Sequence, residues 1–155
     1  MTIKYNNVFI EDAYTICGNY ENDGPLSKYF DKKYEKDLYF GEKSWEQAEV
    51  HLLKEANTNI LKKNKLKEED IDLLISGDLQ NQIAASNYMA REFNIPFLGI
   101  FEACSTSGEG LAIGSTYIEG GFAKRILVST SSHNMAAEKQ FRNPTEYGAP
   151  KPETA

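Results

Sequence analysis

Three short and almost continuous apolar runs recur along this sequence, each separated from the next by a longer stretch with helical character. The runs are Ile71 to Ser76, Phe97 to Phe101 and Arg125 to Thr130. Runs of this length and composition are typical of strands that are buried on both faces of a sheet. Because parallel strands need a crossover between them, usually a helix, this alternation predicts a layered α/β fold with a mostly parallel sheet.

The stretches around these runs contain the signals expected of the remaining elements. Ser44 and Gln47 have the spacing of a capping box, and an apolar stripe follows at helical spacing: Trp45, Ala48, Leu52, Leu53, Ala56 and Ile60. Two more helices are predicted for Ile83 to Phe93 and for Ser105 to Glu119, where Gly120 and Gly121 follow. A first strand is predicted for Asn7 to Ile16.

Composition narrows the classes of function. The chain has 155 residues, enough for one domain, and its net charge of −6 makes nucleic acid a poor partner. Cys17 and Cys104 do not form a disulfide framework, and no Cys/His spacing suits zinc, so we expect no metal site and no cofactor. The N-terminus is not a signal peptide, and no apolar run approaches the roughly 20 residues of a membrane span.

The stretch from Phe97 to Gly114, FLGIFEACSTSGEGLAIG, is the one that best suits chemistry. A buried strand is followed at once by Cys104 and Ser105, and a helix rich in small residues begins there. The unpaired N–H groups and the dipole of such a helix stabilise an anion, whether a thiolate, an oxyanion or a carboxylate. The alternative is that Cys104 is a small buried residue without a chemical role.

Other patterns in and after this helix carry weaker signals. Gly108, Gly110 and Gly114 resemble a dinucleotide fingerprint, but they lie inside the helix and not in the turn before it, so close helix packing is the better interpretation. His133 and Asn134 follow the last predicted strand, at the sheet edge where open α/β folds bind ligands. His133 is a candidate donor or general base, and Arg142 could grip a carboxylate with two hydrogen bonds.

Several segments together are similar to a known family. ACSTS, at Ala103 to Ser107, resembles the nucleophile region of thiolases and ketoacyl synthases. Six longer segments, spread over nearly the whole chain, resemble the stage V sporulation protein AD family. They are FIEDAYTICG, GPLSKYFD, YFGEKSWEQAE, GDLQNQIAASNYMAREF, IPFLGIFEACSTS and SSHNMAAEKQFRNPTEYG. The resemblance implies that residues 1–155 are the N-terminal half of a thiolase-like fold, with a buried central helix and with the C-terminal half absent from this chain.

The resemblance also implies a function. It predicts binding of dipicolinic acid, pyridine-2,6-dicarboxylate, during its uptake into the developing spore, without catalysis. The expected ligand-binding residues in this half are Cys104, Ser105, His133, Asn134 and Arg142. The alternative is an acyl-thioester condensing enzyme or acyltransferase with Cys104 as nucleophile; a third, less favoured interpretation is a nucleotide-binding domain.

Expectations about assembly follow from the same resemblance. It implies a homodimer formed through the strand from Phe97 to Phe101, and an apolar strand of this kind would be hazardous as a bare edge. It also implies association with other stage V sporulation proteins at the cytoplasmic face of the spore or forespore inner membrane, as a peripheral protein without a transmembrane segment.

Overall fold

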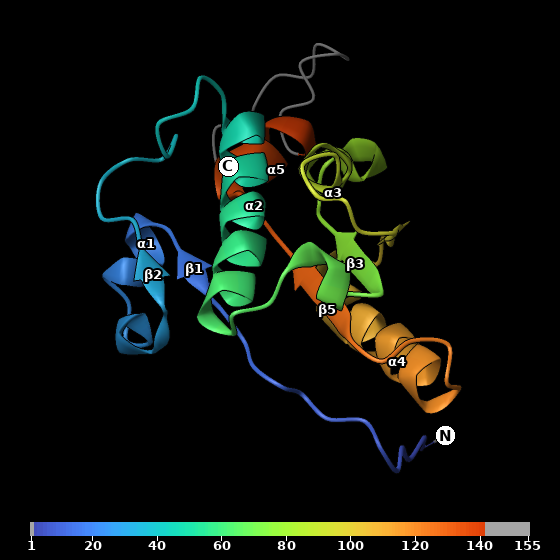
Figure 1. The fold of residues 1–155 in the computed structure, drawn as a ribbon. Coiled ribbons are helices and arrows are strands. Elements are labelled where there is room, and N and C mark those ends of the chain that lie inside the picture. The colour runs from blue at the N-terminus through green and yellow to red at the C-terminus, as the bar shows by residue number, and fades with distance from the viewer. Residues whose placement is uncertain (1, 142–155) are drawn as a thin grey trace.

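A three-stranded parallel sheet forms the centre of the computed structural model, which describes residues 2–141 (Figure 1). Its strands are β3 (Leu73–Gly77), β4 (Phe97–Gly99) and β5 (Ile126–Thr130), in the order β4-β3-β5. Leu74 of β3 lies opposite Phe97 on one side and Leu127 on the other. The predicted α/β class with a parallel sheet is therefore confirmed.

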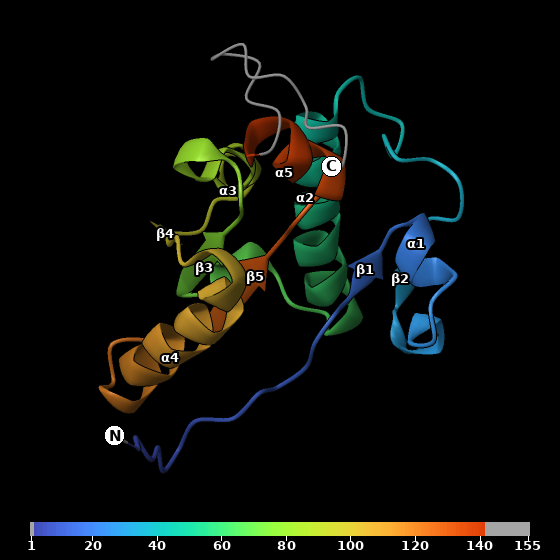
Figure 2. The same cartoon turned by 180° about the vertical axis from the view of Figure 1, so that it is seen from behind.

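Helices cover both faces of this sheet (Figure 2). The helices α2 (Trp45–Lys63) and α3 (Ala84–Ala90) lie over one face and form the main core with it. This core is built from Leu53, Leu61, Ile71, Leu74, Met89 and Ile95. The helix α4 (Thr106–Glu119) packs on the opposite face, where Ile75 and Val128 point, because successive side chains of a strand alternate between faces.

The start of α2 is set by its predicted cap. Ser44 has extended backbone angles, and its hydroxyl accepts a hydrogen bond from the Gln47 N–H at 3.2 Å. The apolar stripe then faces the sheet, with Ala48 and Leu53 almost wholly buried. The sequence-based prediction of this helix is confirmed from its cap to its basic last turn, where Lys62 and Lys63 lie.

The N-terminal segment differs from its prediction. A strand was expected from Asn7 to Ile16, but only β1 (Ile16–Cys17) forms, and it pairs in parallel with β2 (Lys32–Lys33) in a separate two-stranded sheet. The residues before β1 run alongside β5 and α4 (Figure 1). They are held by side-chain bonds such as those from Arg125 to Glu11, and not by a backbone ladder. The prediction of a long first strand is wrong for this reason.

Short elements complete the described chain. They are the helices α1 (Asn19–Asn22) and α5 (Asn134–Phe141) and the 3-10 turns η1 (Ser27–Tyr29), η2 (Glu68–Asp70), η3 (Asn81–Ile83) and η4 (Ala103–Ser105). The helix expected from Ile83 to Phe93 is shorter than predicted. Left-handed backbone angles at Gln82 and Ile83 delay its start to Ala84, and it ends at Ala90, three residues before Phe93. None of the helices within residues 2–141 is long and apolar enough to cross a membrane.

The helix α4 is buried along one side only. Thr106, Gly110 and Gly114 face the sheet and are buried, whereas Leu111 and Tyr117 on the other side are 46% and 40% exposed. The expectation of a central buried helix thus holds for the side that packs on β3 and β5. The opposite side is exposed in this chain.

Candidate functional site

The loops that follow the three parallel strands meet at one edge of the sheet. Asp78 follows β3, Cys104 follows β4, and His133 follows β5. Because β3 lies between its two neighbours, the loops after β4 and β5 are separated by two strand spacings, roughly 10 Å. This is the edge at which open α/β sheets bind ligands.

Cys104 lies in η4, immediately before α4, as predicted. Its side chain is exposed in this chain, so the alternative of a buried structural cysteine does not apply. The turn is held by Thr106, whose hydroxyl accepts from the Glu102 N–H at 3.2 Å and donates to the Ala103 carbonyl at 2.8 Å. The neighbouring Ser105 hydroxyl donates to the Glu102 carbonyl at 2.9 Å.

The start of α4 is pressed closely onto the end of β3. A Cβ atom on Gly77 would lie 2.2 Å from the carbonyl oxygen of Ile100 and 2.6 Å from Thr106 Cγ2. Only glycine permits this approach. At the end of β4, a Cβ on Gly99 would lie 2.3 Å from Ile83 Cδ1, so the loop before α3 covers this strand. The backbone around Cys104 is therefore held firmly by packing.

Non-glycine residues with left-handed backbone angles occur in three of the segments around this edge. Ala103 has φ 45°, Ile83 has φ 49°, and Phe40, which packs against His133, has φ 51°. Such conformations cost energy and persist only where surrounding contacts enforce them. The contacts around these loops therefore hold the backbone of all three residues in strained conformations.

His133, the candidate donor or general base, is buried, with only 5% of its surface exposed. Its Nε2–H donates to the Leu38 carbonyl at 2.7 Å, and its ring lies edge-on to Phe40 with centroids 5.7 Å apart. In the tautomer that makes this hydrogen bond, Nδ1 carries no proton and can accept a hydrogen bond. Within residues 2–141, Nδ1 is buried and has no hydrogen-bond partner.

The other candidates beyond β5 differ in accessibility. Asn134 begins α5 and is exposed, so its side chain is free to meet a ligand. Arg142 lies outside the described residues. The structure thus brings Cys104, Ser105, His133 and Asn134 to one edge, with His133 behind the surface and the other three on it.

A buried polar cluster at the same edge was not predicted. Glu49 of α2 is 1% exposed, and its two carboxylate oxygens accept hydrogen bonds from Gln80 Nε2 and Ser131 Oγ, both at 2.9 Å. Asp78, also 1% exposed, accepts from the backbone N–H groups of Gln80 and Ser86 at 2.8 and 2.7 Å. Burial raises the pKa of Glu49, and nearby Asp78 raises it further, while the two hydrogen bonds and His133 oppose the shift.

A sequence signal for Glu49 did exist. The residue stands four positions after Trp45 and four before Leu53, inside the apolar stripe of α2. A carboxylate at such a position is seldom buried without specific partners. The partners could not be inferred, because Gln80 and Ser131 are 31 and 82 positions away.

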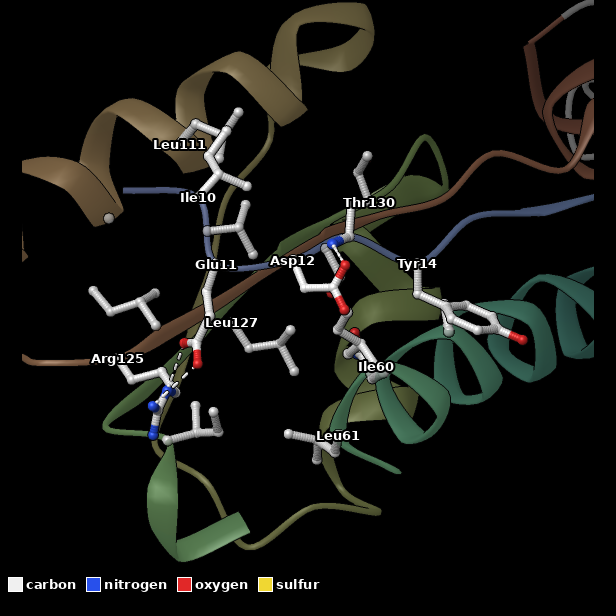
Figure 3. A pocket seen from close by; sticks show the side chains of 18 of the residues that line it. Ile10, Glu11, Asp12, Tyr14, Ile60, Leu61, Leu111, Arg125, Leu127 and Thr130 are labelled. Carbon is white, nitrogen blue, oxygen red and sulfur yellow. Dashed lines mark hydrogen bonds and ion pairs between the residues drawn. The ribbon is translucent and has the colours of Figure 1, made fainter. Parts of the chain in front are cut away.

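A separate hollow of about 660 Å³ lies between the N-terminal segment, β5, α2 and α4 (Figure 3). Apolar side chains such as Ile10, Ile60, Leu111 and Leu127 line its middle. Ion pairs tie the segment to both sides: Glu11 bonds Arg125 at 2.8 Å, and Asp12 bonds Lys63 at 2.9 Å. Neither Cys104 nor His133 lines this hollow.

Known structures define the class of fold. 3-Oxoacyl-[acyl-carrier-protein] synthase III from Aquifex aeolicus VF5 is similar, with a TM-score of 0.51 and 22% sequence identity; the likeness covers 56% of this chain and 30% of that chain. This identity is low enough that the likeness concerns the fold alone. The chain is a protein of thiolase-like fold.

The particular family is given by sequence. This chain belongs to the stage V sporulation protein AD family, whose model matches residues 1–155. Stage V sporulation protein AD from Bacillus subtilis (strain 168) is 53% identical over 148 residues, which are 96% of this chain and 44% of that protein. The chain therefore spans less than half of the length of this relative.

Proposed function

We propose that this sporulation protein binds dipicolinic acid and takes part in its uptake into the developing spore, using a thiolase-like fold without catalysis. The observation that carries the proposal is the meeting of anion-suited groups at one sheet edge in a member of a sporulation family. These groups are the start of α4, where no side chain caps the N–H groups, and the exposed Asn134 at the start of α5. Both are suited to carboxylates.

Dipicolinate is a planar dianion that carries two carboxylates on one aromatic ring. A chain with a net charge of −6 can hold it only where donors are concentrated. The N–H groups after Cys104 would meet one carboxylate, and Asn134 with Arg142 would meet the other. His133 would support this second position from behind, because its ring is buried against Phe40.

Calorimetric titration with dipicolinate tests this function. We expect saturable binding by the full-length protein, and weak or no binding by residues 1–155, because two charge-assisted contacts of about 1.5–3 kcal/mol each would barely offset the loss of ligand freedom. Absence of binding by the full-length protein would overturn the proposal.

The second candidate is an acyl-thioester enzyme, favoured by the exposed thiol of Cys104 at the start of α4. A cysteine nucleophile needs a base within reach. His133 is a poor base in the described arrangement, because Nε2 is engaged by Leu38 and Nδ1 is buried. Incubation with an acyl-CoA, followed by mass spectrometry, distinguishes the candidates: an acyl adduct on Cys104 would favour the enzyme.

The assembly expected for this family is part of the proposal. We propose a homodimer formed through β4, which is one of the two edge strands of the sheet. We also propose association with other stage V sporulation proteins at the cytoplasmic face of the spore or forespore inner membrane, as a peripheral protein.

A further inference from the structure

We propose that Glu49 is a positioning residue for the anion site, and that its carboxylate takes up a proton from solvent when an anion binds at the carboxyl edge of the parallel sheet, between the loops after β4 and β5. This inference rests on the proposed function and deepens it. It concerns a residue of α2 that touches no ligand itself. It follows from three features of the cluster around Glu49.

The first feature is the connection that Glu49 makes. One carboxylate oxygen bonds Gln80, in the loop between β3 and α3, and the other bonds Ser131, in the loop between β5 and α5. Ser131 is two residues from His133 and three from Asn134. Glu49 therefore joins the two loops at the carboxyl ends of neighbouring strands, and it sets the path of the chain that leads into α5.

The second feature is the absence of a full counter-charge. Within residues 2–141, no lysine or arginine forms an ion pair with Glu49; Lys139 of α5 instead pairs with Glu46 at the helix surface. The titratable groups that act on Glu49 are Asp78 beyond β3, which disfavours its charge, and His133 beyond β5, which favours it. A buried carboxylate with two neutral donors thus accepts a proton more readily than an exposed carboxylate does.

The third feature is that both protonation states fit the same hydrogen bonds. When Glu49 is ionised, Gln80 and Ser131 both donate to it. When it is protonated, its carbonyl oxygen still accepts from Gln80, and its hydroxyl donates to Ser131 Oγ, which rotates to accept. A proton can therefore enter without breaking the connection between the loops.

Anion binding supplies the reason for the proton to enter. A dianion at this edge adds negative charge close to Glu49 and Asp78, and it displaces water that screens them. Both effects disfavour the charged form of Glu49. By linkage, the affinity for the anion must then increase as the pH falls.

Substitution of Glu49 by Gln separates positioning from charge. Glu49→Gln keeps one acceptor for Gln80 and one donor for Ser131 but cannot be ionised, whereas Glu49→Ala removes both contacts. Glu92→Gln is the matched control, because Glu92, just beyond the end of α3, is an exposed carboxylate that pairs with Lys54 of α2 at 2.8 Å. Circular dichroism first establishes that each full-length variant is folded.

The test is dipicolinate titration of these full-length proteins between about pH 6 and pH 8, where ordinary carboxyl groups of the ligand stay ionised. We expect the affinity of the parent and of Glu92→Gln for dipicolinate to fall about threefold to tenfold as the pH rises from 6 to 8. Because the bound proton comes from the buffer, the binding enthalpy of both proteins should depend on the ionisation enthalpy of the buffer. Glu49→Gln should bind at pH 8 at least as tightly as the parent does at pH 6, with no buffer dependence. Glu49→Ala should bind about tenfold more weakly than Glu49→Gln at every pH.

Two results would overturn the inference. If Glu49→Gln keeps the pH dependence and buffer dependence of the parent, the proton is taken up elsewhere, and if Glu49→Ala binds as tightly as Glu49→Gln does, Glu49 positions nothing. Either result leaves the proposed function intact. Absence of dipicolinate binding by the parent at every pH would instead overturn the proposed function, and this inference with it.

Discussion

The backbone of Gly110 in α4 lies directly against the side chain of Val128 in β5. A Cβ atom on residue 110 would stand 2.6 Å from Val128 Cγ1, closer than real contacts allow. Gly108, two residues earlier in the same helix, has no neighbour that its added Cβ would meet. The two glycines therefore form a matched pair for testing the helix packing.

We predict opposite effects for alanine at these positions. Gly110→Ala should destabilise the chain by about 1–3 kcal/mol, since α4 must move away from the sheet. Gly108→Ala should stabilise it by about 0.5–1 kcal/mol, because alanine favours the helix and meets no obstacle. Urea unfolding of both variants measures this difference; equal effects would contradict the described packing of α4.

The two cysteines should differ in reactivity. Cys104 is exposed, whereas Cys17 is buried and its thiol pKa is raised, chiefly by desolvation. We expect iodoacetamide to label Cys104 in the native protein and Cys17 only after unfolding. Peptide mass spectrometry over a time course measures this; prompt labelling of native Cys17 would show that β1 and β2 do not protect it as described.

Acid should release the N-terminal segment. Hydrogen bonds from Lys63 and Asn64 lower the pKa of Asp12 to about 2. Because a lowered carboxyl pKa stabilises the folded form only while the group is ionised, this tie is complete above about pH 4 and is lost as the pH falls towards 2. The protection of the residues around Asp12 from hydrogen exchange, relative to the exchange of the unfolded chain at the same pH, should therefore fall over that range.

Asp12→Asn provides the control for this acid effect. The amide keeps the size of the side chain but not its charge, so this segment should be less protected from exchange at neutral pH, and its protection should not decrease further in acid. An unchanged exchange rate at neutral pH would mean that the ion pair with Lys63 does not hold the segment.

The proposed dimer is tested at the edge strand. Leu98 lies in the middle of β4 and pairs with Ile75 of β3 on one side only. A charge at an exposed edge opposes pairing between sheets, so Leu98→Lys should convert a full-length dimer to a monomer. Light scattering measures the mass of both proteins; a parent that is monomeric at high concentration would rule out this dimer.

Local signals predicted much of the fold. The cap at Ser44, the apolar runs of β3, β4 and β5 and the small residues of α4 each specify an element through neighbouring residues. The prediction of the first strand was wrong because apolar residues that alternate along a segment favour a strand, but a strand forms only where a partner strand is available for pairing. The local sequence pattern does not show whether such a partner exists. Its exposed Phe9 and Ile10 show that apolar character alone does not bury a segment.

Sequence reasoning indicated that Cys104 and His133 follow strand ends, but it did not indicate that His133 is buried. Strand ends placed Cys104 and His133 at one edge, because parallel strands share their direction. The burial of His133 depends on Leu38 and Phe40, which are more than 90 positions earlier in the chain. Contacts between residues so far apart in the sequence produce no local pattern from which they could be predicted. The partners of Glu49 were not predicted for the same reason.

The most direct test of the account compares dipicolinate binding by the full-length protein with that of Asn134→Ala and Arg142→Ala. Asn134 is exposed at the start of α5, so its replacement should leave the fold unchanged and remove one contact to the ligand. A charge-assisted hydrogen bond of about 1.5–3 kcal/mol corresponds to at least tenfold in affinity. We therefore predict calorimetric binding by the parent and at least tenfold weaker binding by each variant; equal affinity in all three proteins would contradict a ligand site at this edge of the sheet.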